Sequence, residues 1–140
     1  MEINLRAPWA ALLLAMTVVA SPALAQMEYP EKCKSNLAPS GGMAMGDHGI
    51  SMPETTEYQN ESMKGMKSMS MNMMQGMMKK DPDVSFVCGM IAHHMGAISM
   101  AQVELKYGDN VEAKADAQRI IDAQTKEIEK MTAWVEKEVK

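Results

Sequence analysis

The hydrophobic residues divide the chain into unlike regions. After an early apolar run, Trp9–Ala20, the types Leu, Ile, Val and Phe become rare. Between residues 26 and 82 they occur only at Leu37 and Ile50, whereas thirteen occur between residues 83 and 140. The ordinary hydrophobic core is therefore expected in the C-terminal part of the chain.

The C-terminal region has the pattern of two helices. Asp81 and Pro82 are a favoured N-cap and first helical position, and apolar residues then recur at helical spacing until Gly108-Asp109-Asn110 supplies a turn. A second stripe follows directly. We expect helices over about 82–107 and 110–139 joined as an antiparallel hairpin. The stripes are Phe86, Met90, Ala97, Ala101 and Leu105, then Ala117, Ile120, Ile121, Gln124, Ile128, Met131 and Val135.

The region before this hairpin is dominated by methionine. Met, Lys and Gln favour helix, which predicts a Met-rich helix over about 60–80. The hairpin alone is small for a stable core. It is expected to be covered by this helix, by a second protomer of a homodimer that gives a four-helix arrangement, or by both. The predicted fold is all-α, a ferritin-like helical bundle formed by a helical domain over 61–140. Residues 26–60, rich in Gly and Pro, are expected to be a flexible, disordered arm.

The first 25 residues have the features of a secretory signal peptide. Arg6 precedes the apolar run, and Ala23-Leu24-Ala25 forms a small-residue cleavage motif. We expect no later stretch to be apolar enough to span a bilayer, so the mature chain is expected in the periplasm without membrane attachment. In an oxidising compartment Cys33 and Cys88 are expected to form a disulfide, the alternative being a thiolate pair for Cu(I).

Composition excludes several classes of function. A net charge of −4 lacks the basic footprint of nucleic-acid binding, and aromatic residues are only 4% of the chain. Di-iron carboxylate enzymes require a Glu three residues before a His on each of two helices. No His of this chain has such a Glu, so no enzyme is predicted. The carboxylates of the C-terminal helices are expected at a solvated surface, at Glu104, Glu112, Glu127 and Glu129.

Potential metal donors gather in residues 89–101. At about 100° per residue, Met90, His93 and Met100 share one helix face, while His94 is turned by a quarter revolution and Met95 by another quarter. Two neighbouring sites, or one site with His94 in a supporting role, are therefore expected. Gly89 and Gly96 would let another helix or a ligand approach closely, although tight packing alone would also explain them.

The chain contains 18 methionines among 140 residues. This abundance of thioether sulfur indicates which class of metal ion the donors suit. Thioether and imidazole donors select Cu(I), with Ag(I) as its mimic, whereas hard dications require oxygen. Packing, or a sacrificial sulfoxide sink, is the competing interpretation of the methionines. His48 is a weaker candidate for an accessory site on the arm. Further candidate donors are Met63, Met66, Met73, Met77 and Met131.

The segment 86–101, Phe-Val-Cys-Gly-Met-Ile-Ala-His-His-Met-Gly-Ala-Ile-Ser-Met-Ala, followed by Glu127-Ile128, Met131 and Trp134, resembles the CopM-like family of exported, ferritin-like helical proteins, formerly catalogued as a domain of unknown function. The resemblance implies copper binding for buffering, trafficking or tolerance, with a possible partner in another periplasmic copper protein. It carries the family's metal-site motif onto Met90, His93, His94 and Met100. Ala92 departs from the family's usual Pro, and Met95 from its usual Gln. The alternative function is a helical stress or scaffold protein that uses Met as oxidisable core filler.

Overall fold

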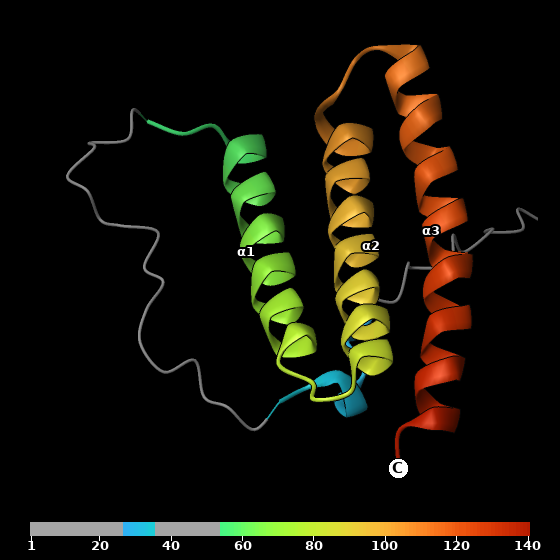
Figure 1. Cartoon of the computed structure of the whole chain (residues 1–140). Helices are drawn as coiled ribbons and strands as arrows, with labels where there is room; N and C mark the ends of the chain where they lie inside the picture. The colour runs from blue at the N-terminus through green and yellow to red at the C-terminus, as the bar shows by residue number, and fades with distance from the viewer. Residues whose placement is uncertain (1–26, 36–53) are drawn as a thin grey trace, which may run out of the picture.

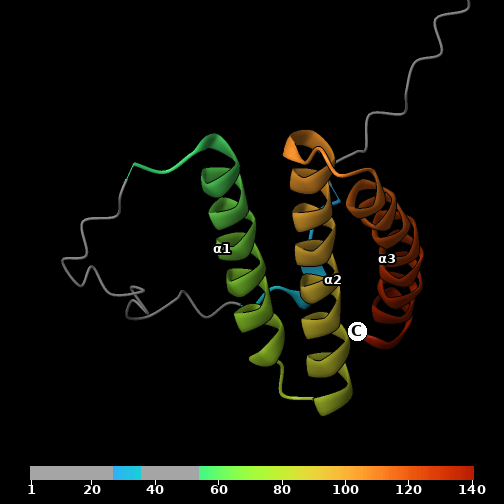
Figure 2. The same cartoon turned by 90° about the horizontal axis from the view of Figure 1, so that it is seen from above.

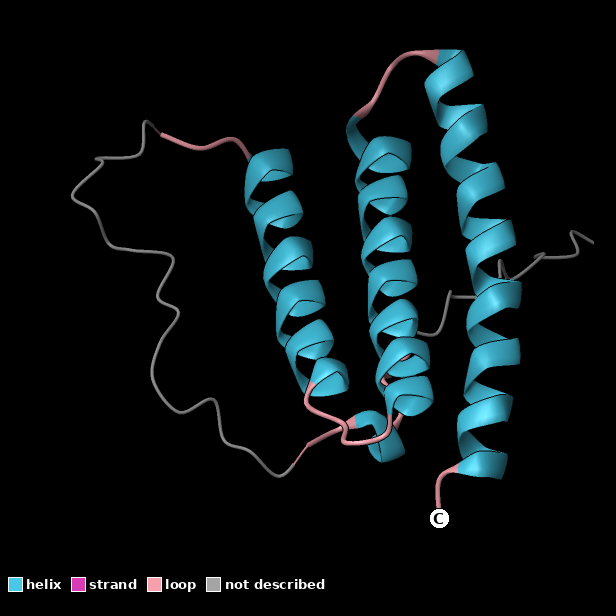
Figure 3. Ribbon diagram, viewed as in Figure 1, coloured by secondary structure: helices cyan, strands magenta, loops and turns pink. Residues whose placement is uncertain are grey.

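The structure is a computed structural model that describes residues 27–35 and 54–140. Those residues form one short 3₁₀ helix and three α-helices, with no strand among them, so the all-α prediction is confirmed. The elements are drawn in Figures 1 and 3. They are η1 (Glu31–Cys33), α1 (Glu57–Met77), α2 (Pro82–Tyr107) and α3 (Val111–Glu138). Within the described residues the chain contributes three long helices, which leaves the four-helix arrangement with a second protomer a prediction.

Side-chain caps fix where the helices begin. The Asp81 carboxylate accepts hydrogen bonds from the backbone N–H groups of residues 83 and 84, as the Asp-Pro pair predicted, and Asn110 caps α3. At α1, Thr56 and Gln59 form a reciprocal capping box. This box starts α1 at Glu57, three residues before the expected boundary.

The three helices form a layer with α2 in the middle. α1 and α3 flank it on opposite sides, and each packs on α2 (Figures 1 and 2). The α1–α2 seam depends on glycine: a Cβ at Gly76 would lie 2.8 Å from the backbone nitrogen of Gly89, and a Cβ at Gly96 would lie 2.2 Å from the sulfur of Met69. Gly96 therefore serves helix packing, whereas a Cβ at Gly89 would meet nothing within 4 Å.

The predicted stripe of α3 is mostly buried against α2, but the expected inner stripe of α2 is only partly buried. Ala101 is buried, whereas Phe86 is 66% exposed and, on α3, Ile120 is 43% exposed. Phe86 remains exposed because the described helices cover α2 on two flanks and leave one side open. The buried members of the α3 stripe are Ala117, Ile121, Ile128 and Val135.

Residues 27–35 are not part of a flexible arm, contrary to expectation. Tyr29 and Cys33 are buried, and Cys33 forms a disulfide with Cys88 at a Cα–Cα distance of 5.4 Å. The Tyr29 hydroxyl donates a hydrogen bond of 3.1 Å to the Cys88 carbonyl oxygen, and burial raises the pKa of this hydroxyl to about 12. The disulfide and this hydrogen bond therefore attach the segment to the start of α2. The expected leader, residues 1–25, and His48 lie outside the described residues.

By length and composition, α2 could cross a membrane. The expectation that no stretch after the leader would be apolar enough is therefore wrong. In the structure this helix lies between α1 and α3 and supplies the central side chains of the core. Only 33% of its apolar window is buried, so packing against α1 and α3 accounts for part of its apolar character.

Candidate metal centre

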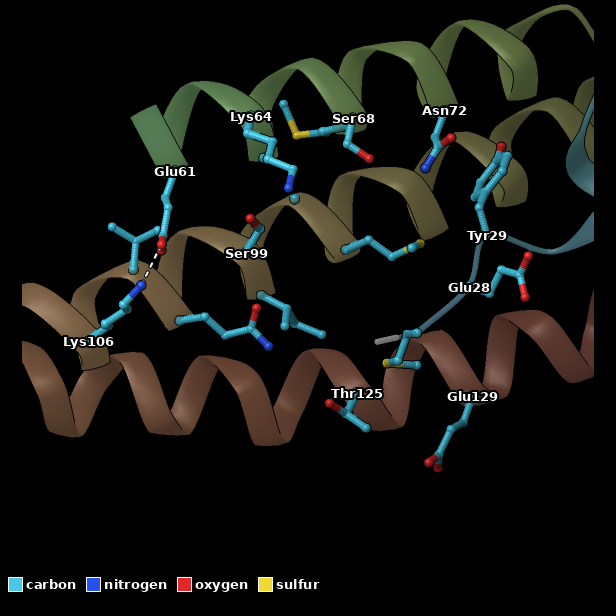
Figure 4. Close-up of a pocket in the computed structure, with 18 residues that line it drawn as sticks. Glu28, Tyr29, Glu61, Lys64, Ser68, Asn72, Ser99, Lys106, Thr125 and Glu129 are labelled. Carbon is cyan, nitrogen blue, oxygen red and sulfur yellow. Dashed lines mark hydrogen bonds and ion pairs between the residues drawn. The ribbon is translucent and has the colours of Figure 1, made fainter. Parts of the chain in front are cut away.

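The two sides of the helix layer differ in chemistry. On one side, α1 and α3 border an open groove whose floor is α2 and whose end is formed by residues 27–29 (Figure 4). Its α1 wall is polar, and Glu61 accepts hydrogen bonds from the Lys106 ammonium and the Tyr107 hydroxyl. Both bonds lower the pKa of Glu61, and the bond from Lys106 has the larger effect. The polar lining residues of α1 are Glu61, Lys64, Ser68 and Asn72.

The opposite side of the layer carries methionine. Residues two positions from a groove-lining residue lie about 160° away from it around the helix axis. By this rule Met66 lies opposite Ser68 on α1, and His93 lies opposite Met95 on α2. We call the resulting surface the methionine face. The rule places Met63, Met66, His93 and Met100 on it. Helical spacing from these residues adds the neighbours on the same sides, Met73 and Met77 of α1 and Phe86 and Met90 of α2.

Most donors of the methionine face are open to solvent. Met100 is 54% exposed, Met66 is 49% exposed, and His93 is exposed, while Met90 and Met73 are half-buried. Ala97, which is half-buried, occupies the same side of α2 between His93 and Met100. The sequence prediction that Met90, His93 and Met100 share one face is thus met by the helix geometry of α2.

His94 has a different environment from its neighbour. It is 8% exposed, and its Nε2 lies 2.6 Å from Oε2 of Glu127 on α3. The rings of His93 and His94 meet edge to face with centroids 5.9 Å apart. A neutral His94 that donates Nε2–H to the carboxylate has an unprotonated Nδ1, and this Nδ1 atom is buried without a hydrogen-bond partner in the structure.

A family model described as "Domain of unknown function (DUF305)" matches residues 22–135. The chain belongs to this family. The match covers all three α-helices except the last residues of α3, including every candidate donor of α1 and α2. The comparison with curated proteins gives no match. The family description assigns no activity.

In this DUF305 protein the remaining predicted donors are not all brought together. Met95 lines the groove and is therefore separated from His93 by the body of α2. Met131 is half-buried and packs against the core, and it lies one helical turn after Glu127 on the same side of α3. No three His, Cys, Asp or Glu side chains within residues 27–35 and 54–140 form a group that could hold a metal ion. A site centred on His93 would therefore have to include methionine sulfur.

Sequence reasoning missed the role of Glu127, which was grouped with the surface carboxylates. Its side chain is 58% exposed, yet one oxygen reaches the buried ring of His94. The hairpin register gives a partial signal: reflection about Asp109 places His94 opposite Gln124, three residues before Glu127 on α3. The register therefore brings the two residues near each other but does not by itself pair them.

Proposed function

We propose that this protein binds Cu(I), and Ag(I) as its mimic, on the methionine face, as cargo that it buffers or passes on outside the cytoplasm. The observation that carries this proposal is the arrangement of α2 and α1. A solvent-open histidine lies on the same side of the layer as thioethers from two helices. Neutral sulfur and nitrogen donors suit a soft, singly charged ion and cannot neutralise a hard dication.

The exposure of these donors supports exchange rather than permanent storage. His93 and Met100 reach solvent directly, so an ion held there could enter from solution and leave to another protein without any movement of the helices. The predicted export signal and the resemblance to the CopM-like family support a role in copper tolerance in the periplasm, with another periplasmic copper protein as the recipient.

The His94–Glu127 pair supports the proposal independently. Metal-binding histidines commonly donate their second ring N–H to a carboxylate, which fixes the tautomer and the ring orientation. Glu127 occupies that position relative to His94, and the Nδ1 atom left over has no hydrogen-bond partner among residues 27–35 and 54–140. We assign Nδ1 of His94 as a buried donor beside the methionine face, and Glu127 as its positioning residue.

The central test replaces His93. The purified protein is titrated with silver nitrate in chloride-free buffer, while bound metal is counted and the His ring signals are followed by NMR. We expect saturable uptake with a shift of the His93 ring signals, and loss of at least one bound equivalent in His93→Ala. Gln102→Ala, an exposed substitution on the opposite side of α2, serves as the control. Unchanged uptake in His93→Ala would refute the proposal and favour the stress or scaffold alternative.

A second test concerns Glu127. Removing such a positioning carboxylate typically lowers metal affinity about 10- to 100-fold, so Glu127→Gln should weaken silver binding by that factor. The matched control is Glu129→Gln on the groove side of the same helix. Equal affinities of the two variants would show that Glu127 has only a structural role.

A further inference from the structure

α1 carries a second methionine stripe that the methionine face does not include. Met71, Met74 and Met78 are 51%, 52% and 51% exposed. Met74 lies about 160° from Gly76 around the helix axis, and Gly76 marks the seam with α2. The stripe therefore points away from α2, at the edge of the described helix layer that α1 forms (Figure 1).

The spacing of this stripe allows three sulfurs to meet. Residues three and four apart are neighbours on a helix surface, and the intervals here are three and then four. Met71 and Met78 are about 10.5 Å apart along the axis, with Met74 between them. Met78 is the C-cap and keeps α-helical dihedrals, and its N–H bonds to the Met74 carbonyl oxygen. Because methionine has three rotatable bonds, the outer two side chains can converge on the middle one.

Core packing does not explain these residues. Scattered apolar surface residues need no explanation, but a contiguous exposed apolar patch does. Among the described residues, α1 packs on α2, and these three side chains lie on the far side from that contact.

We propose that Met71, Met74 and Met78 form a separate thioether-only site for one soft monovalent ion, Cu(I) or Ag(I). The site extends the proposed function to a second location on the protein, but it uses none of the residues of the methionine face. It needs no histidine. It would therefore take up metal over the whole pH range in which the protein is folded, because thioethers do not titrate.

The test follows the methionine methyl groups. The protein is labelled with ¹³C at the methionine methyl positions, and silver nitrate is added stepwise. We expect the signals of Met71, Met74 and Met78, assigned from single Leu variants, to shift together, and to do so in a His93→Ala background as well. The triple Leu variant should bind one fewer silver ion. The reciprocal control, with Met63, Met66 and Met77 changed to Leu, should retain the shifts.

A register control separates geometry from methionine count. Met74→Leu combined with Gln75→Met keeps the number of thioethers but moves one of them about 100° around the helix. This variant should bind as weakly as Met74→Leu alone, and thermal unfolding checks that it folds. Full binding by the register variant, or shifts at His93 without shifts at the three methionines, would overturn this site while leaving the proposed function intact. Shifts at the three methionines without any at His93 would support this site and overturn the proposed site on the methionine face.

Discussion

The disulfide between Cys33 and Cys88 should contribute a large share of the stability of this fold. It closes a loop with a sequence separation of 55 residues. In the chain-entropy model, a crosslink over a loop of this length destabilises the unfolded chain by about 4 kcal/mol at 25 °C. A typical small domain has only about 5–15 kcal/mol in total. Opening the bond should therefore bring the protein close to the limit of stability.

The measurement is denaturant unfolding of the oxidised protein, of the protein with reductant, and of Cys33→Ala/Cys88→Ala. For a urea m-value of about 2 kcal/mol/M, a loss of about 4 kcal/mol lowers the midpoint by about 2 M. The double variant should lose somewhat more than reduction alone, since both sulfurs are fully buried and their removal leaves a cavity.

A control isolates the crosslink from the contacts around it. Tyr29→Phe removes the hydrogen bond to the Cys88 carbonyl oxygen but keeps the disulfide and the buried ring, and it should cost about 1 kcal/mol. A loss on reduction no larger than that of Tyr29→Phe would refute the reasoning. It would mean that the unfolded chain gains little freedom when the bond opens.

Three further predictions concern the helices. Gly76→Ala should destabilise the protein by about 1–3 kcal/mol, because its Cβ would strike backbone atoms of α2; Gly96→Ala meets only a flexible side chain and should cost less, and equal unfolding midpoints would contradict the rigid seam. Asp81→Ala should cost about 1 kcal/mol through loss of the α2 cap, and an unchanged midpoint would contradict that role. The lowered pKa of Glu61 means that its stabilisation is complete above the unfolded pKa and is lost as pH falls through the folded one; the melting-temperature difference between wild type and Glu61→Gln should therefore vanish in acid, and a constant difference would contradict it.

The α3 helix shows what the sequence could predict. Its apolar residues keep to one side, so the pattern identified both the helix and most of its buried positions, from Ala117 to Val135. Asp81 and Asn110 likewise marked the helix starts, since side-chain caps are local and visible in the sequence. The bounds of α1 were each misplaced by three residues, its start because the Thr56–Gln59 capping box was not recognised and its end because the helix stops at Met77 instead of about 80.

The α2 helix shows what the sequence could not predict. Apolar or small residues occur on all its sides, so periodicity could not distinguish the sides facing α1 and α3 from the open one. Phe86 was accordingly expected inside and is exposed. The pairing of His94 with Glu127 depends on tertiary contact across 33 positions. Residues 27–35 were misjudged for a similar reason, since their order depends on burial of Tyr29 against α2 rather than on any local propensity.

The single seam between α1 and α2 has a consequence for dynamics. α1 meets the rest of the described chain mainly along α2, so it should open more easily than the hairpin, and its amide hydrogens should exchange first. An ion that takes ligands from both helices would fasten that seam, because a ligand that binds only the closed form stabilises it. Slower amide exchange in α1, a helix that contains no histidine, would then indicate that the metal site is occupied.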